Sequence, residues 1–235
     1  MKRLRCVPVG KALIIEHDET GPVGGVGERL IERGFELHPF RVLEDFSNPL
    51  CTKEFPDPTD FDVVVVLGSL WSVYDKGPIE SWVDREIELV RKAHRTGIPV
   101  LGLCFGGQVL SAALGGEVTR AAQPEIGWYE IETDLPEVVS SGPWLEWHYD
   151  KFTVPDGAVE VARTKVSSQV FRAGKSVGTQ FHPEITPDIV TNWVTVGQEE
   201  LSVLQINPKS IVADSVDYQV DARQRADRLV DWFLS

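Results

Sequence analysis

The sequence has few cysteines and no long apolar run. These two features argue against a disulfide-rich protein and against a membrane-spanning one. Three cysteines occur in 235 residues, Cys6, Cys51 and Cys104, and no two of them have the Cys-x-x-Cys spacing of a redox or structural metal site. This odd, widely spaced set argues against a disulfide framework and predicts a reducing, cytoplasmic location. The longest apolar run, residues 63–67, is far shorter than the about 20 residues of a membrane-spanning helix.

Positive charge is also scarce. Lys and Arg total 23 against 36 Asp and Glu, which gives a formal net charge of -13. This charge repels the phosphate backbone of nucleic acids and anionic membrane surfaces, so we expect neither as a partner. The basic start Met-Lys-Arg-Leu-Arg resembles a signal peptide, but Pro8, Gly10 and Lys11 interrupt the apolar stretch that should follow. We therefore expect no export signal.

Short apolar runs alternate with amphipathic stretches in the first half of the chain. Residues 12–15, 62–67 and 99–103 are rich in β-branched and apolar side chains. The second and third runs are apolar at successive positions, which is typical of parallel strands buried on both faces. The pattern predicts an α/β fold, a three-layer sandwich with a mainly parallel central sheet and helices on both sides.

The second half of the chain has a different pattern. From about residue 126 to 181, short strand-like segments are separated by Gly, Pro and Asp, which predicts an antiparallel extension of the same sheet. Apolar residues at helical spacing predict amphipathic helices over residues 79–94 and in the C-terminal tail, where they are Ala226, Leu229, Val230 and Phe233. Because no linker divides the chain, we expect one domain over residues 1–235.

The segment around Cys104 has the order strand, sharp turn, helix. Gly102 and Gly106 flank the cysteine, an arrangement typical of a nucleophile elbow, in which glycines permit a tight bend and leave room for a substrate. A thiol at the start of a helix faces the positive end of the helix dipole, which favours the thiolate. The backbone N–H of Phe105 could then stabilise an oxyanion. The alternative is a buried apolar cysteine, the interpretation we adopt for Cys6 and Cys51.

A base and a carboxylate follow in Phe181-His182-Pro183-Glu184. Pro183 favours extended backbone at His182, and the two-residue period of extended chain places His182 and Glu184 on the same side. His182 could then accept the thiol proton and deliver it to a leaving amine, while Glu184 orients the imidazole. The alternative is a surface turn before a helix that starts near Pro187.

Four other histidines compete for the role of base. His148 is the principal rival, because aromatic neighbours and Asp150 could bury and orient it. For the remaining three we expect a hydrogen-bonded or solvated structural histidine: His17, His38 and His94. A glycine cluster, Gly21, Gly24, Gly25 and Gly27, lacks a complete phosphate-loop pattern and predicts a turn into a helix.

The two motifs resemble those of a known family. Residues 102–108 are similar to the Gly-x-Cys-x-Gly-x-Gln signature of class I (triad) glutamine amidotransferases, and residues 181–184 resemble their second signature, about 80 residues later. Residues 67–75, 125–128 and 147–150 are similar to stand-alone proteins related to the amidotransferase domain of GMP synthase. The resemblance extends from about Ala12 to Thr186, and the final 50 residues match loosely.

The resemblance implies hydrolysis of the glutamine side-chain amide through a γ-glutamyl thioester on Cys104. Ammonia would be released or passed to an acceptor, and any ATP-dependent synthetase would be a separate partner protein. It implies that Gln108 holds the amino-acid end of glutamine. The substrate-binding residues that we predict are Gln108, Gly106, Gly127, Trp128 and His148. No metal cluster is recognisable, and no cofactor is implied.

One segment departs from the family pattern. Relatives usually have Gly-Gly-Pro where this chain has Gly68-Ser69-Leu70, and that loop supplies the second oxyanion N–H in the family. We therefore expect the oxyanion donors among Phe105, Gly68 and Ser69, although Ser69 adopts positive φ less readily than glycine.

Two alternative functions remain open at this stage. A γ-glutamyl peptide hydrolase would use the same triad and the same thioester, because only the leaving amine differs. A non-catalytic binding or regulatory homologue would keep the fold without the reaction, but the presence of all three triad residue types argues against it.

Overall fold

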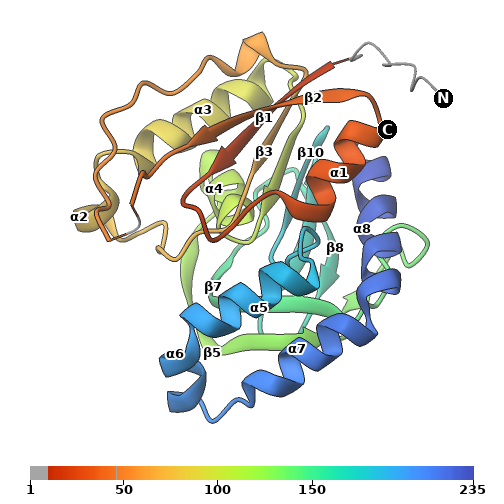
Figure 1. Ribbon diagram of the computed structural model, residues 1–235. Helices are drawn as coiled ribbons and strands as arrows, with labels where there is room; N and C mark the ends of the chain where they lie inside the picture. Colours follow the sequence, from red (N-terminus) through yellow and green to blue (C-terminus); the bar gives the residue numbers. More distant parts are fainter. Residues whose placement is uncertain (1–9, 46) are drawn as a thin grey trace, which may run out of the picture.

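The computed structural model describes residues 10–45 and 47–235. Its centre is an eight-stranded sheet in the order β2-β1-β3-β4-β10-β9-β8-β6 (Figure 1). In that order the strands span Phe35–Arg41, Gly10–Glu16, Val63–Val66, Val100–Leu103, Ser176–Thr179, Ser168–Ala173, Val159–Arg163 and Glu132–Thr133. The strands from β2 to β10 pair in parallel, and β9, β8 and β6 continue the sheet antiparallel. The predicted mainly parallel sheet with an antiparallel portion is confirmed.

The parallel strands β1, β3, β4 and β10 are buried on both faces, because successive side chains enter different cores. Leu13 and Ile15 of β1 pack in one apolar cluster, with α3 (Val83–Arg95) and α4 (Phe105–Ala113). Ala12 and Ile14 pack in the other, with α1 (Gly24–Glu32) and α8 (Gln219–Phe233). Figure 1 shows these two pairs of helices on opposite sides of the sheet. The three-layer arrangement follows from uninterrupted apolar runs that need cover on both faces.

The predicted antiparallel extension is present as β9, β8 and β6, but other strands of the predicted range, residues 126–181, do not belong to it. β5 (Val118–Tyr129) and β7 (Trp144–Phe152) form a separate two-stranded sheet, and β10 pairs in parallel with β4. The physical reason is a third apolar core. Side chains of β5 and β7, among them Ile126 and Leu145, pack against helices that follow the second motif.

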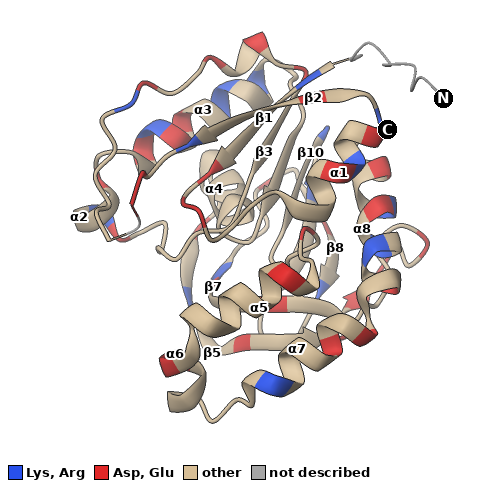
Figure 2. Cartoon of the chain, in the orientation of Figure 1, with Lys and Arg blue, Asp and Glu red and all other residues tan. Residues whose placement is uncertain are grey.

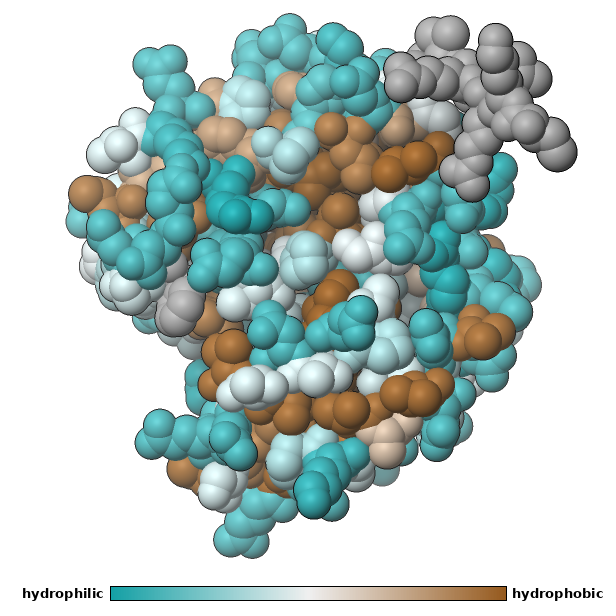
Figure 3. Space-filling model, viewed as in Figure 1, coloured by the Kyte–Doolittle hydropathy of each residue, from teal (hydrophilic) through white to brown (hydrophobic). Residues whose placement is uncertain are grey.

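Those helices are α5 (Pro187–Val196), α6 (Gln198–Val203) and α7 (Pro208–Asp217). Figure 1 shows α5 and α7 beside the β5–β7 sheet, and Figure 3 shows apolar side chains gathered on the same part of this face. The N-cap of α5 is Thr186, whose hydroxyl accepts from the N–H of Ile189, and Pro187 occupies the first helical position. The predicted helix start near Pro187 is confirmed.

The other predicted helices are found with changed boundaries. The helix expected over residues 79–94 is divided, because α2 (Lys76–Ile79) ends and Trp82 leaves helical geometry, with φ -140°, before α3 begins. The C-terminal helix is confirmed as α8, with all four predicted apolar residues buried. Figure 2 shows charges of both signs on α1 and α8, and Arg29 binds Asp231 across them at 2.6 Å. Within the described residues, no helix has the length and apolar character needed to cross a membrane.

Candidate active site

Cys104 lies at the sharp turn between β4 and α4. Its backbone has φ 51° and ψ -107°, a strained conformation for a residue with a side chain. A Cβ on Gly102 would collide with the carbonyl oxygen of Gly106, and a Cβ on Gly106 would collide with that of Val66. The glycines therefore make room for strand β3 and the first turn of α4, so the space we expected them to leave for a substrate is filled by backbone.

His182 and Glu184 form a buried pair beside this turn. His182 Nδ1 lies 2.8 Å from Glu184 Oε1, and the two side chains are 5% and 2% exposed. The indole of Trp193 packs edge-on against the His182 ring, with 4.7 Å between ring centroids. Burial by itself would lower the pKa of His182, but the Glu184 carboxylate and the neighbouring Cys104 raise it well above its usual value.

The backbone of this pair is anchored from both sides. The N–H of His182 donates to Leu145 of β7 over 2.9 Å, and the N–H of Gly25 donates to the Glu184 carbonyl over 2.8 Å. A Cβ on Gly24, where φ is +43°, would collide with the same carbonyl. The glycine cluster thus forms the predicted turn into α1, and it also brings that helix against the carboxylate residue.

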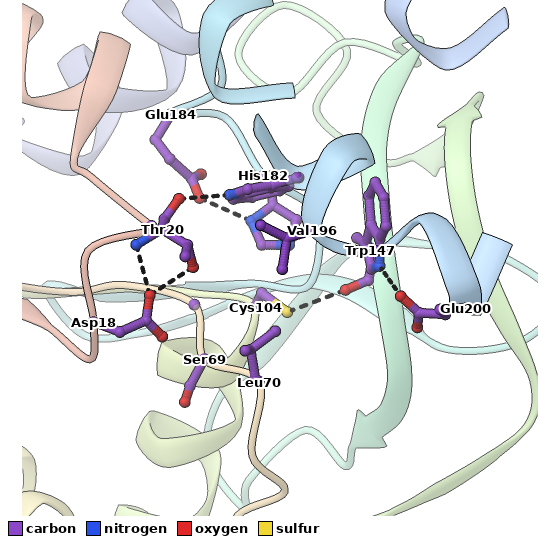
Figure 4. Close-up of a pocket in the computed structure, with 14 residues that line it drawn as sticks. Asp18, Thr20, Ser69, Leu70, Cys104, Trp147, His182, Glu184, Val196 and Glu200 are labelled. Atoms are coloured by element: carbon purple, nitrogen blue, oxygen red, sulfur yellow. Dashed lines mark hydrogen bonds and ion pairs between the residues drawn. The ribbon is translucent and has the colours of Figure 1, made fainter. Parts of the chain in front are cut away.

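A pocket opens over Cys104, His182 and Glu184 (Figure 4), with a cavity volume of about 100 Å³. The Sγ atom lies 3.6 Å from Gln180 Nε2 and 3.9 Å from the Trp147 carbonyl oxygen. Among the described residues none is a hydrogen-bond partner of His182 Nε2. The ring nitrogen that would exchange a proton with the thiol or a substrate is therefore available.

The pocket walls come from four parts of the chain. The remaining lining residues are Asp18, Thr20, Gly21, Gly68, Ser69, Leu70, Trp147, Trp193, Val196, Gly197 and Glu200. Figure 4 shows Asp18 and Thr20 on one side of Cys104, and Trp147 and Glu200 on the other. The lining of this pocket contains carboxylates but, within the described residues, no Lys or Arg.

Two predicted oxyanion residues, Gly68 and Ser69, line this pocket. Phe105, the third, occupies the first position of α4 directly after Cys104. In the part of the chain that the structure describes, neither the N–H of Ser69 nor that of Phe105 has a hydrogen-bond acceptor. Both donors are therefore free for a substrate oxygen, and their role stays a prediction.

The structure places two predicted substrate-binding residues inside the protein rather than on the pocket wall. Gln108 is buried in α4, with its Nε2 3.4 Å from Gln180 Oε1, and Gln180 in turn contacts Cys104 Sγ. Gly106 packs against β3. Gln108 is therefore connected to the thiol through Gln180. Direct contact of Gln108 or Gly106 with substrate stays a prediction.

Two further predicted residues, Gly127 and Trp128, lie on β5 outside the pocket lining. Gly127 has φ +123°, which a side chain would disfavour, and Trp128 donates from its indole N–H to the Ile211 carbonyl over 3.3 Å. Trp128 thereby ties β5 to α7. Their substrate-binding roles stay predictions.

His148, the predicted rival base, is enclosed in an acidic network. Its Nε2 lies 3.1 Å from Glu125 and 3.3 Å from Glu146, while its Nδ1 donates to the backbone carbonyl of Asp150 over 2.9 Å. Burial would lower the pKa of His148, but the two glutamates raise it to about 10. The Asp150 carboxylate, expected to orient the ring, instead accepts from Ser72 and Tyr74. A charged imidazole with both nitrogens engaged cannot act as a base.

Several lining residues were missed by the sequence motifs. Asp18 and Thr20 follow β1, while Trp193 and Glu200 belong to α5 and α6. Neither part of the chain contains a sequence motif typical of a functional site. The indole N–H of Trp193 donates to the Thr20 carbonyl over 2.7 Å and so joins the two segments. Only tertiary packing brings these residues to Cys104.

Of the two remaining cysteines, only Cys51 lies among the described residues. Cys51 is 4% exposed within an apolar cluster, which confirms its assignment as a core residue. Cys6 lies outside the described residues. Across residues 10–45 and 47–235, no group of three or more His, Cys, Asp or Glu side chains could hold a metal ion.

Comparison with known proteins identifies related sequences. The profile of a family described as "Glutamine amidotransferase class-I" matches residues 25–191. The GMP synthase [glutamine-hydrolyzing] of Thiobacillus denitrificans is 32% identical over 181 residues, 68% of this chain and 31% of that protein. One subunit of the GMP synthase [glutamine-hydrolyzing] of Sulfurisphaera tokodaii is 29% identical over 136 residues, 54% of this chain and 69% of its own length. The chain thus spans about a third of the longer relative.

Solved structures agree over nearly the whole chain. The crystal structure of a glutamine amidotransferase from Thermotoga maritima has a TM-score of 0.82 at 25% identity and covers 96% of this chain and 98% of its own. One from Methylobacillus flagellatus has a TM-score of 0.81 at 26% identity, with coverages of 97% and 94%. The helices after residue 191, outside the family profile, are therefore included in the structural match.

Proposed function

Because the chain belongs to the class-I glutamine amidotransferase family, we propose that it hydrolyses the side-chain amide of glutamine through a γ-glutamyl thioester on Cys104. The observation that carries the proposal is the His182–Glu184 pair, 2.8 Å apart, buried beside a cysteine on a strained strand-to-helix turn. Nucleophile, base and orienting carboxylate are the three parts that this type of acyl transfer requires.

The steps follow from the positions of these groups. The Cys104 sulfur attacks the amide carbon, and the C–N bond breaks as His182 gives its Nε2 proton to the departing nitrogen, which leaves as ammonia. Water then attacks the thioester carbon while His182 takes its proton, and the C–S bond breaks to give glutamate. Return of that proton from His182 to the sulfur restores the thiol. Glu184 holds Nδ1 and stabilises the imidazolium in both steps.

We propose that a separate synthetase or acceptor protein uses the ammonia. One relative is named as a subunit of GMP synthase, and the longer relative matches this chain over about a third of its length. Leu70 and Val196, both of which line the pocket, are 65% and 52% exposed. Apolar side chains at a pocket mouth are suited to contact with another protein.

A γ-glutamyl compound is the second candidate substrate, and the pocket supplies a specific reason. Trp193, Val196 and Glu200 extend the pocket beyond the residues matched by the family profile. Room beyond the scissile amide would accept a leaving amine larger than ammonia. The pocket lining contains the carboxylates of Asp18 and Glu200 and, among the described residues, neither Lys nor Arg. This favours a cationic or neutral leaving amine over an amino acid with a free carboxylate.

The test measures glutamate release from glutamine and from γ-glutamyl amides of a diamine, an uncharged amine and an amino acid. Cys104→Ala is the inactive control and Cys51→Ala the matched cysteine control. Hydrolysis of glutamine that Cys104→Ala abolishes supports the first candidate, and hydrolysis of the larger amides alone supports the second. No release from any substrate, with no labelling of Cys104 by a glutamine-like electrophile, would favour a non-catalytic homologue.

A further inference from the structure

A third buried histidine, paired with a carboxylate, lies behind the pocket, on the far side of the Gly68 loop. His17 follows β1 directly and Glu86 lies in α3, and both side chains are 0% exposed. His17 Nε2 is 3.1 Å from both carboxylate oxygens of Glu86, and His17 Nδ1 is 2.8 Å from the carbonyl oxygen of Gly68. The imidazole therefore bridges a helix to the loop that faces Cys104.

Aromatic side chains hold the His17 ring in this position. Phe105 packs edge-on against it with 4.8 Å between ring centroids, and Trp82 lies at 5.3 Å. Phe105 is itself the residue after Cys104. The ring is thus fixed by its packing as well as by its two polar contacts, and it has no path to solvent.

Both partners of the His17 ring are hydrogen-bond acceptors. A carbonyl oxygen and a carboxylate can be satisfied together only if both ring nitrogens carry a proton, which is the imidazolium form. Burial lowers the pKa of His17, but Glu86 and the Gly68 carbonyl outweigh it and raise that pKa. The neighbouring Asp18 carboxylate acts in the same direction.

The hydrogen bond to Gly68 fixes the direction of the next N–H. The Gly68–Ser69 peptide bond is trans, so the Gly68 carbonyl and the Ser69 N–H point in opposite directions. With the carbonyl held toward His17, the Ser69 N–H points away from it, toward the pocket that Ser69 lines. A Cβ at Gly68 would lie 3.1 Å from His182 Cε1 and 3.9 Å from Cys104 Cβ, which places this peptide at the reacting groups.

We propose that Glu86 and His17 are positioning residues that hold the Gly68–Ser69 peptide as an oxyanion donor for the Cys104 reaction, an inference that rests on the proposed function. The imidazolium also polarises the peptide, because hydrogen bonds in a chain strengthen one another. The relay orients the peptide by tertiary contact, in a chain that has Ser69, a residue with a side chain, at the second position of the loop.

The central test compares kcat for glutamine in wild type, His17→Ala and His17→Asn. The Asn amide can place an N–H close to the position of Nδ1, so it keeps the donor without the charge. Loss of one oxyanion donor lowers kcat by about 10²- to 10³-fold, and we expect a fall of about 10²-fold in His17→Ala, with KM changed little. His17→Asn should recover at least about 10-fold of that loss, since its donor to Gly68 is retained. His38→Asn, on β2, is the matched histidine control.

Alkylation of Cys104 by iodoacetamide separates positioning from general damage, because this displacement at a saturated carbon forms no oxyanion. We expect the alkylation rate of His17→Ala to stay within about threefold of wild type while glutamine hydrolysis falls about 10²-fold. Equal losses in both reactions would mean that His17 merely supports the fold and would overturn the inference. An active wild type with an equally active His17→Ala variant would also overturn it.

A structural readout keeps the inference testable if a variant does not fold or the wild type releases no ammonia. A nitrogen-15 NMR titration of wild type should show both His17 ring nitrogens protonated to higher pH than in an ordinary histidine, and Glu86→Gln should lower that pH and leave only Nδ1 protonated above it. A neutral wild-type ring without a proton on Nδ1 would overturn the inference. A wild type inactive on every γ-glutamyl amide would instead count against the proposed function.

Discussion

His182 Nδ1 lies 2.8 Å from Glu184 Oε1, and a single residue, Pro183, separates the two in the chain. The predicted extended backbone is replaced by a turn at Pro183 and Glu184, and this turn brings the carboxylate to the imidazole. The same histidine is held to β7 through its backbone N–H, and the same glutamate to α1 through its carbonyl. The position of the imidazole over Cys104 is therefore fixed by contacts from two distant segments.

We predict that Glu184→Gln lowers kcat by about 10²- to 10⁴-fold, in the range seen when the orienting carboxylate of a triad is neutralised. The charge of Glu184 raises the pKa of His182, so its loss lowers that pKa. As pH rises, His182 in the variant loses its proton earlier than in wild type. Activity that depends on the imidazolium should therefore decline at a lower pH than in wild type. The measurement is the pH profile of kcat/KM.

The matched control for that prediction is Asp188→Asn, an exposed carboxylate four residues later. It should leave both the rate and the profile unchanged. A Glu184→Gln profile with an unshifted basic limb would show that Glu184 does not act through the imidazole.

A second prediction concerns the buried His148 network. The folded-state pKa of His148 is about 10, against an ordinary value of 6.5. Because the folded pKa is the higher one, the stabilisation is fully present below about pH 6.5 and is lost as pH rises through about 10. The free energy of unfolding in urea should therefore fall across this range. The raised pKa of Glu146, caused by burial, acts in the same direction.

Replacing His148 by Gln removes the cation between two buried carboxylates. We expect a loss of about 3–5 kcal/mol near neutral pH, the typical cost of breaking a buried ion pair. The decline in stability between pH 6.5 and 10 should also become shallower, since the titrating imidazole is gone. His38→Gln provides the comparison, and identical slopes in wild type and His148→Gln would contradict the assignment.

The parts of the site that local sequence could predict are those built from neighbouring residues. The elbow at Cys104 and the His182–Glu184 pair each occupy a few consecutive positions. The start of α4 places Cys104, and a turn at residues 183–184 places Glu184 beside His182. The parallel strands β1, β3 and β4 were equally predictable, because burial on both faces requires continuous apolar runs.

Residues that act across the fold were not predictable in this way. His17 and Glu86 lie 69 positions apart and meet only because β1 and α3 pack together. Glu200 reaches the pocket through its contact with the Trp147 indole N–H at 3.1 Å. The separate β5–β7 sheet was missed because its third core depends on later helices. These contacts depend on tertiary packing, which the local pattern of a single sequence does not reveal.

A third prediction tests the close approach of backbone at the elbow. In Gly106→Ala the new Cβ would collide with the backbone carbonyl of Val66 in β3. The backbone of β3 or of α4 must therefore shift to accommodate it. We expect a loss of about 1–3 kcal/mol in unfolding free energy, the usual cost of overpacking, together with slower thioester formation as Cys104 moves. Gly77→Ala, in α2 with no atom within 4 Å of the new Cβ, is the matched control. Equal stability of the two variants would exclude the predicted collision.

The last prediction concerns the C-terminal helix and its connection to the site. Phe233 of α8 is 1% exposed, whereas Val220 of the same helix is 67% exposed. Phe233→Ala should lower the free energy of unfolding by about 3–5 kcal/mol, because a large buried side chain leaves a cavity. Val220→Ala should change it by less than about 0.5 kcal/mol. Denaturant titration of both variants measures the difference.

A loosened α8 should also affect catalysis before the whole protein unfolds. Asp231 of α8 pairs with Arg29 of α1, and Gly25 at the start of α1 donates to the Glu184 carbonyl. Loss of α8 packing therefore weakens the support of Glu184. We expect the temperature at which Phe233→Ala loses glutaminase activity to lie below its global unfolding transition by circular dichroism. Coincident transitions would mean that α8 stabilises the molecule as a whole and has no separate link to the site.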